Sequence, residues 1–117
     1  MEKNEIFPIT IRELAEKKAA LAPENIEAWR NFSKTVFQAG ALDEKTKQLI
    51  AVAVAHVTQC PYCIRAHTPQ ALRKGASQAE SKEASRVAAE TRAGAAYARP
   101  AERRRGKEWW AGGSPQR

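Results

Sequence analysis

The sequence predicts an all-α protein of about five helices, and two observations support this fold class. Apolar residues recur at helical spacing in several segments, and each segment begins with a capping residue or a proline. Alternating patterns typical of strands are almost absent from the 117 residues. A chain of this length forms one domain with a moderate core, and such short chains often gain stability by oligomerising.

The first two predicted helices lie before residue 40. Thr10 and Glu13 have the spacing of a capping box, and an alanine-rich run follows at residues 14–22. Pro23 suits the first turn of a second helix, which we expect to end at Gly40. The second helix carries an apolar stripe at helical spacing, made of Ile26, Trp29, Phe32, Val36 and Phe37. We expect this stripe to pack in the core rather than to bind a cofactor.

A third helix is predicted after Asp43, whose carboxylate can cap its first turn. The apolar positions of this helix are Leu49, Ile50, Val52, Ala53, Val54 and Val57. Because they surround the helix almost completely, we expect it to be the buried central helix. A valine-rich run can also form a strand, and this alternative stays open here. The capping Asp43 and the polar start at residues 45–47 favour the helix.

Two further helices complete the predicted fold. Proline is well tolerated at the first helical position, where its missing N–H would have no partner, so Pro61 predicts a fourth helix with Cys60 as its N-cap. This helix is expected to run to Gly75. Ser77 and Glu80 form a second capping box and open a fifth helix, whose many alanines permit close approach between helices.

The C-terminal end has a different composition from the rest of the chain. We predict a helical domain at residues 1–98 and a basic, irregular tail at residues 99–117. The tail mixes Pro, Gly, Arg and Trp without periodicity, and it carries more than half of the net charge of +7. Because the charge is concentrated there, nucleic-acid binding is not expected. The chain has no long apolar run and no signal-like start, so we predict a cytoplasmic protein with no membrane partner.

Both cysteines and both histidines of the chain lie in one short stretch, at His56, Cys60, Cys63 and His67. On one continuous helix their spacing would place all four along one face. A thiol at a helix N-terminus faces unpaired backbone N–H groups, which favour the thiolate. Two thiols separated by two residues can close a disulfide, so one can attack a peroxide or a disulfide and the other can resolve the product. His67, one turn beyond Cys63, could move the proton.

Other chemistries fit this stretch less well. Haem attachment needs a histidine directly after the second cysteine, where this chain has Ile64. One zinc ion could not collect all four side chains from a straight helix, since the 11 residues from His56 to His67 span about 16 Å. A break near Gln59 would relax this limit, so zinc stays an alternative, as does a purely structural pair of cysteines.

Two motifs of this chain are similar to motifs of the carboxymuconolactone decarboxylase family, in its alkylhydroperoxidase D-like (AhpD-like) branch. One motif is the segment at residues 42–51, and the other is Cys60-Pro61-Tyr62-Cys63-Ile64 followed by His67. The resemblance covers about residues 25–98. It implies an all-helical fold that assembles as a homotrimer or homohexamer. It also implies peroxidase or disulfide-reductase activity without a metal or organic cofactor, with a hydroperoxide as substrate and a thiol or dithiol as electron donor.

The resemblance also implies a role for each residue of the pair. Cys63 would attack the peroxide, Cys60 would resolve the product, and His67 would belong to a proton relay. The decarboxylases that name the family generally lack the cysteine pair, so lactone decarboxylase activity is not expected here.

The chain departs from the family pattern at the relay. The family's relay glutamate stands twelve residues before the first cysteine, where this chain has Gln48, whose amide cannot exchange a proton as a carboxylate does. The relay often has a histidine between the cysteines, where this chain has Tyr62. His56 and Glu44 are therefore further relay candidates. The alternative function is a non-enzymatic helical module that senses redox state or binds a metal.

Overall fold

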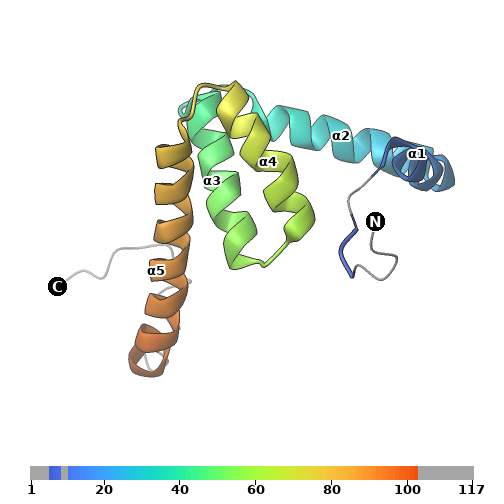
Figure 1. Ribbon diagram of the computed structural model, residues 1–117. Coiled ribbons are helices and arrows are strands. Elements are labelled where there is room, and N and C mark those ends of the chain that lie inside the picture. Colours follow the sequence, from blue (N-terminus) through green and yellow to red (C-terminus); the bar gives the residue numbers. More distant parts are fainter. Residues whose placement is uncertain (1–5, 9–10, 103–117) are drawn as a thin grey trace.

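The computed structural model describes residues 6–8 and 11–102, and these residues form helices and short connections only. In chain order the helices are α1 (Arg12–Leu21), α2 (Pro23–Phe37), α3 (Glu44–Val57), α4 (Pro61–Arg73) and α5 (Gln78–Glu102) (Figure 1). The all-α prediction is confirmed, and the alternative of a strand at the valine-rich run is wrong. None of the helices in the described ranges is long and apolar enough to cross a membrane.

Helix α3 is the centre of the fold, because it packs against both α4 and α5 (Figure 1). Helices α2 and α1 extend away from this three-helix unit: α2 touches α3 only lightly, and α1 packs lightly against α2. The Cα radius of gyration is 18.2 Å, whereas a compact chain of this length would have about 13 Å. The single chain is therefore elongated, with one arm formed by its two N-terminal helices.

Two helix starts predicted from the sequence are confirmed by capping hydrogen bonds. At the start of α3, the backbone N–H of Thr46 donates to Asp43 Oδ1 at 2.7 Å. Before α5, the N–H of Glu80 donates to Ser77 Oγ at 3.0 Å, and the N–H of Ser77 donates to Glu80 Oε1 at 2.9 Å. Each cap satisfies a backbone group that the helix leaves unpaired, which typically stabilises the fold by about 1 kcal/mol.

The bounds of four helices differ from the prediction. Helix α4 ends at Arg73, two residues before Gly75. Helix α1 begins after Ile11, whose side chain makes no capping bond, and Thr10 of the predicted capping box lies outside the described residues. Helix α2 ends at Phe37, three residues before Gly40. Helix α5 continues to Glu102, past the predicted start of the tail at residue 99. The remaining tail, residues 103–117, lies outside the described residues.

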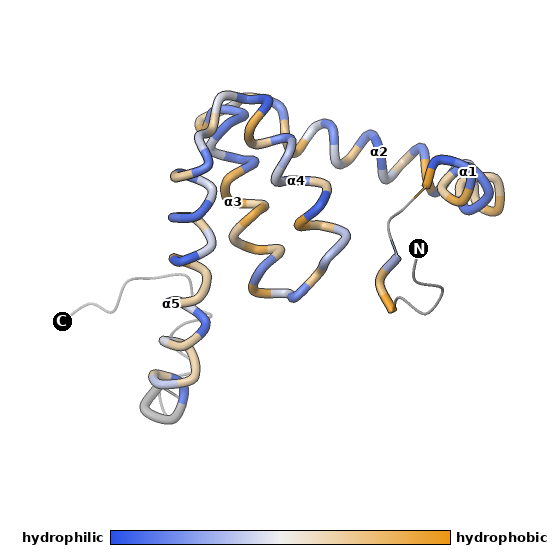
Figure 2. Tube along the Cα trace, viewed as in Figure 1, coloured by the Kyte–Doolittle hydropathy of each residue, from blue (hydrophilic) through white to orange (hydrophobic). Residues whose placement is uncertain are grey.

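The buried core of the chain is small. Its centre consists of Val52, Ala71 and Ala76, with Leu49 packed against them, and Val52 is the one large side chain that is fully buried among the described residues. In Figure 2 the apolar colouring is most continuous along α3, which supplies Leu49 and Val52 to this core. Alanines allow α4 and α5 to approach α3 closely, but they bury little apolar area.

The central helix is nevertheless not buried all round. Ile50 and Val54 of α3 are 46% and 53% exposed. On α2, Trp29 and Phe32 are 65% and 58% exposed, and no residue of the helix is fully buried. The prediction that the α2 stripe packs in the core is therefore wrong for the single chain, because α2 contacts α3 only lightly and leaves Trp29 and Phe32 largely exposed.

Candidate redox site

The cysteine pair lies at the N-terminus of α4. Cys60 is the N-cap and Pro61 is the first helical residue, as the sequence predicts. Cys60 and Cys63 form a disulfide, with their Cα atoms 5.3 Å apart. The backbone N–H of Cys63 also donates to Cys60 Sγ at 3.2 Å. When the disulfide is reduced, the unpaired N–H groups and the helix dipole at this end favour a thiolate.

A tight turn between α3 and α4 positions Cys60. Gln59 adopts a left-handed backbone conformation with φ of 55°, which is rare for a residue other than glycine. The backbone N–H of Cys60 then donates to the carbonyl of Ala55 at 3.0 Å, which ties the first cysteine to the end of α3. The turn breaks the helix that would otherwise carry all the cysteines and histidines on one face.

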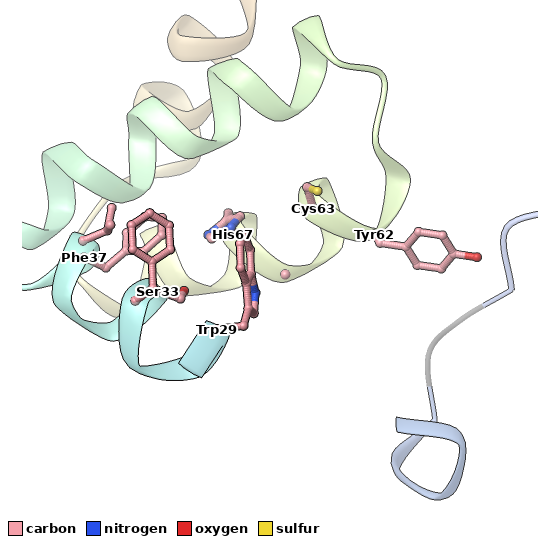
Figure 3. A pocket seen from close by; sticks show the side chains of 9 residues that line it. Trp29, Ser33, Phe37, Tyr62, Cys63 and His67 are labelled. Atoms are coloured by element: carbon pink, nitrogen blue, oxygen red, sulfur yellow. The ribbon is translucent and has the colours of Figure 1, made fainter. Parts of the chain in front are cut away.

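A groove of about 420 Å³ opens beside the pair, between α2 and α4. Its lining is formed by Trp29, Phe32, Ser33, Val36 and Phe37 of α2 and by Tyr62, Cys63, Ala66 and His67 of α4. Figure 3 shows Cys63 and His67 on α4 with Trp29 and Phe37 across from them, while the Tyr62 ring points away from the others. Cys63 lines the groove and Cys60 does not. Cys63 is thus the sulfur that a molecule in the groove would meet.

His67 is held by two contacts on one side of the groove. Its Nδ1–H donates to Oε1 of Gln48 at 2.9 Å, and its ring stacks on Phe37 with a centroid distance of 5.0 Å and an angle of 25°. Burial lowers the pKa of His67 below its ordinary value. Burial therefore favours the neutral imidazole, and the ring contacts an amide rather than a carboxylate.

The other two relay candidates lie elsewhere. His56 donates from Nδ1 to the carbonyl of Val52 at 2.7 Å, and it lines a separate cavity of about 230 Å³ between α3 and α5, beside Ser85 and Arg92. Glu44 forms an ion pair with Lys74, at 2.8 Å between Oε2 and Nζ. The structure thus brings Gln48 to His67 and gives His56 and Glu44 partners at other places.

Two features of the site had no clear signal in the sequence. The Phe37 ring belongs to the stripe that the sequence assigns to the core, and only the position of α2 beside α4 brings it onto His67. The N-terminal segment also reaches the start of α4: Phe7 packs edge-on against Tyr62 with centroids 6.0 Å apart, and Arg65 donates to the carbonyl of Phe7 at 3.0 Å. No periodicity or cap marks residues 6–8 for this contact.

Metal binding was an alternative use of the cysteine stretch. Within residues 6–8 and 11–102, no group of three or more His, Cys, Asp or Glu side chains is arranged to hold a metal ion. The left-handed turn at Gln59 separates His56 from His67, since their rings line different cavities.

Comparison with known proteins finds a family whose sequence pattern this chain matches. The pattern of the carboxymuconolactone decarboxylase family matches residues 23–102. A crystal structure of a Methanobacterium thermoautotrophicum protein is 38% identical in sequence, with a TM-score of 0.66, and covers 70% of this chain and 92% of that one. A Thermotoga maritima member of the family, for which a part in the antioxidative response has been suggested, is 36% identical, with a TM-score of 0.52, over 55% of this chain and 66% of that one.

A bacterial relative shares more of the sequence over a similar length. The Paracoccus denitrificans protein called "uncharacterized protein 4 in cox locus" is 62% identical over 72 residues. The match covers 62% of this chain and 65% of the relative, so this chain spans a little less than two thirds of that protein.

Proposed function

Because this chain belongs to the carboxymuconolactone decarboxylase family and carries a Cys60–Cys63 disulfide, we propose that it is a thiol-dependent peroxidase or disulfide reductase of the alkylhydroperoxidase-like kind. The observation that supports the proposal most directly is the position of Cys63. Its side chain lines an apolar groove together with that of His67. A reactive sulfur beside a proton-transfer group is the minimum that this chemistry requires.

In the proposed reaction the two cysteines begin as thiols. The Cys63 thiol gives its proton to His67, and the resulting thiolate attacks the terminal oxygen of a hydroperoxide. The O–O bond breaks, and the leaving alkoxide takes the proton back from the His67 imidazolium to become an alcohol. Cys63 is then a sulfenic acid, and the Cys60 sulfur displaces its hydroxyl group as water to form the disulfide. An external thiol or dithiol supplies two electrons and two protons and restores both thiols.

A disulfide substrate would follow the same roles. The Cys63 thiolate attacks one sulfur of the substrate and forms a mixed disulfide, and Cys60 then releases the second thiol. Both substrates leave the protein in the state with Cys60 and Cys63 joined. We propose a cytoplasmic setting, where thiol donors keep such a pair in use.

One observation favours the alternative of a redox-sensing or metal-binding module. Gln48 stands where the family's relay has a carboxylate, and an amide neither takes nor gives a proton under these conditions. A sensor needs the pair to cycle once per signal, so it could operate without an efficient relay.

The two proposals differ in turnover. We expect the protein to consume many equivalents of tert-butyl hydroperoxide, or of a small aromatic disulfide, when dithiothreitol regenerates the thiols. The rate should be compared with that of dithiothreitol alone and with a Cys60→Ser, Cys63→Ser double variant. Consumption of a single equivalent followed by arrest would favour the sensor, and added zinc that protects both thiols would favour the metal-binding module.

We also propose that the chain assembles with copies of itself, as a trimer or hexamer. The small core and the half-exposed Ile50 and Val54, one turn apart on α3, support this proposal, because a lone chain would leave them in water. Light scattering should give the mass of three or six chains, and Val54→Glu should shift it toward one chain. Ala20→Glu on α1 serves as the control for added charge. A single-chain mass for the unaltered protein at micromolar concentration would contradict assembly.

A further inference from the structure

The contact between Gln48 and His67 fixes which imidazole nitrogen carries the proton. Gln48 is buried, with 7% of its surface exposed, and it is the only buried polar residue in the described part of the chain. Its Oε1 lies 2.9 Å from His67 Nδ1. A carbonyl oxygen can only accept a hydrogen bond, so Nδ1 must carry the hydrogen, and the lone pair of the neutral ring is then on Nε2.

The Phe37 ring fixes the plane of the same imidazole. The two rings are 25° from parallel, with centroids 5.0 Å apart. Rotation of the imidazole about the Cβ–Cγ bond of His67 would therefore lose this stacking. Gln48 comes from α3 and Phe37 from α2, while His67 belongs to α4. Three separate helices therefore determine one orientation of one side chain.

The surroundings of His67 contain little charge. The titratable side chains that line its groove are Tyr62 and Cys63, both on α4, and no side chain of α2 in the lining carries a charge. The neighbouring cation on α3, Lys47, donates to the carbonyls of Val36 and Gln38 at the end of α2. On the same helix, Lys45 and Glu44 are ion-paired with Glu80 and Lys74.

We propose that Gln48 is a positioning residue that, together with Phe37, holds His67 as a neutral base with the free Nε2 toward the groove that Cys63 lines. This proposal rests on the proposed redox function. In it, His67 is the one ionisable side chain that moves the proton, and no carboxylate takes part. His67 Nε2 accepts the proton from the Cys63 thiol, which yields thiolate and imidazolium. The imidazolium returns that proton to the leaving alkoxide or thiolate.

The amide sets the strength of this base. A carboxylate at position 48 would stabilise the imidazolium, raise the pKa of His67 and make the ring slower to return its proton. The neutral amide orients the ring without that stabilisation. Burial acts in the same direction, since it lowers the pKa of His67. His67 should therefore stay unprotonated, and able to accept the Cys63 proton, down to a lower pH than the histidine of a site with a glutamate relay.

The tautomer can be read directly from nitrogen NMR of the unaltered, reduced protein. The chain has two histidines, so a His56→Gln variant assigns the His67 signals without ambiguity. We expect hydrogen on Nδ1 and a free Nε2 at pH 8. Hydrogen on Nε2 instead would overturn the inference, and this readout does not depend on whether the protein reduces peroxide.

Variants at position 48 test whether the side chain there sets the pKa of His67. In Gln48→Glu, the pKa of His67 measured by NMR should rise by about 1 to 3 units, as expected for an opposite charge in contact. The acid limb of the pH profile for oxidation of Cys63 should move to higher pH with it. Gln48→Leu should give a mixture of tautomers and a rate at neutral pH lower by about 10- to 100-fold. This loss is smaller than the roughly 10²- to 10⁴-fold that a general base contributes, because His67 itself is still present.

Gln48→Asn serves as the conservative control, because it keeps an amide and should recover part of the rate and the original pH profile. An unchanged pKa of His67 in Gln48→Glu would overturn the inference. Normal NMR results with no peroxide or disulfide reduction in any form would instead count against the proposed function and leave the positioning of His67 standing.

Discussion

Replacing Cys63 with serine is expected to lower peroxide and disulfide turnover by at least about 10³-fold, because the hydroxyl of serine is a far weaker nucleophile than a thiolate. Cys63 is the cysteine that lines the groove, and no second thiol replaces it there. The change is small in volume, so the fold should be retained. Turnover of tert-butyl hydroperoxide with dithiothreitol is the measurement, with circular dichroism to confirm helix content.

Cys60→Ser is the matched variant, because it removes one sulfur from the same pair and should fail at a different step. Its Cys63 should still react once, and with a disulfide substrate it should accumulate a mixed disulfide that mass spectrometry detects on the peptide containing Cys63. Trapping on Cys60 in the Cys63→Ser protein, with none in Cys60→Ser, would reverse the roles of attacker and resolver.

Val52→Asp is expected to lower the free energy of unfolding by on the order of 3 to 5 kcal/mol, because it places a charge without a partner in the centre of the core. Val52 is fully buried, with 0% of its surface exposed. A small domain has a total stability of about 5 to 15 kcal/mol, so such a loss should abolish or greatly weaken the cooperative thermal transition.

Val87→Asp provides the control for this change, since Val87 lies on α5 with 62% of its surface exposed. The same substitution at a surface position usually changes stability by less than about 0.5 kcal/mol. Both variants should be melted at one protein concentration, because assembly shifts the apparent stability. A thermal midpoint for Val52→Asp equal to that of Val87→Asp would show that this core does not hold the fold together.

Local signals in the sequence predicted the helix starts well. The capping side chains of Asp43 and Ser77 and the proline after Cys60 act within one turn of the chain, so their effects can be read without knowledge of the fold. The exposed stripe on α2 could not be read in this way. Helical spacing shows that Trp29 and Phe32 share a face, but whether another element covers this face depends on tertiary packing.

At the redox site, too, local sequence patterns could not predict what depends on tertiary packing. Spacing on an assumed continuous helix placed His56 near the pair, but the left-handed turn at Gln59 reverses the chain and leaves His56 facing α5. The resemblance to the family predicts that Gln48 stands at the relay position, and the structure shows that its amide contacts His67. The stacking of Phe37 on His67 depends on how two helices cross, which no local pattern of residues specifies.

The most direct test of the proposed function is a thiol count on the reduced, metal-free protein before and after one equivalent of an organic hydroperoxide. We expect two thiols per chain to be lost rapidly and together, with formation of the Cys60–Cys63 disulfide and one equivalent of alcohol, and a dithiol should restore both. Two thiols that persist after exposure to the hydroperoxide, together with unreacted peroxide, would contradict the redox-pair account.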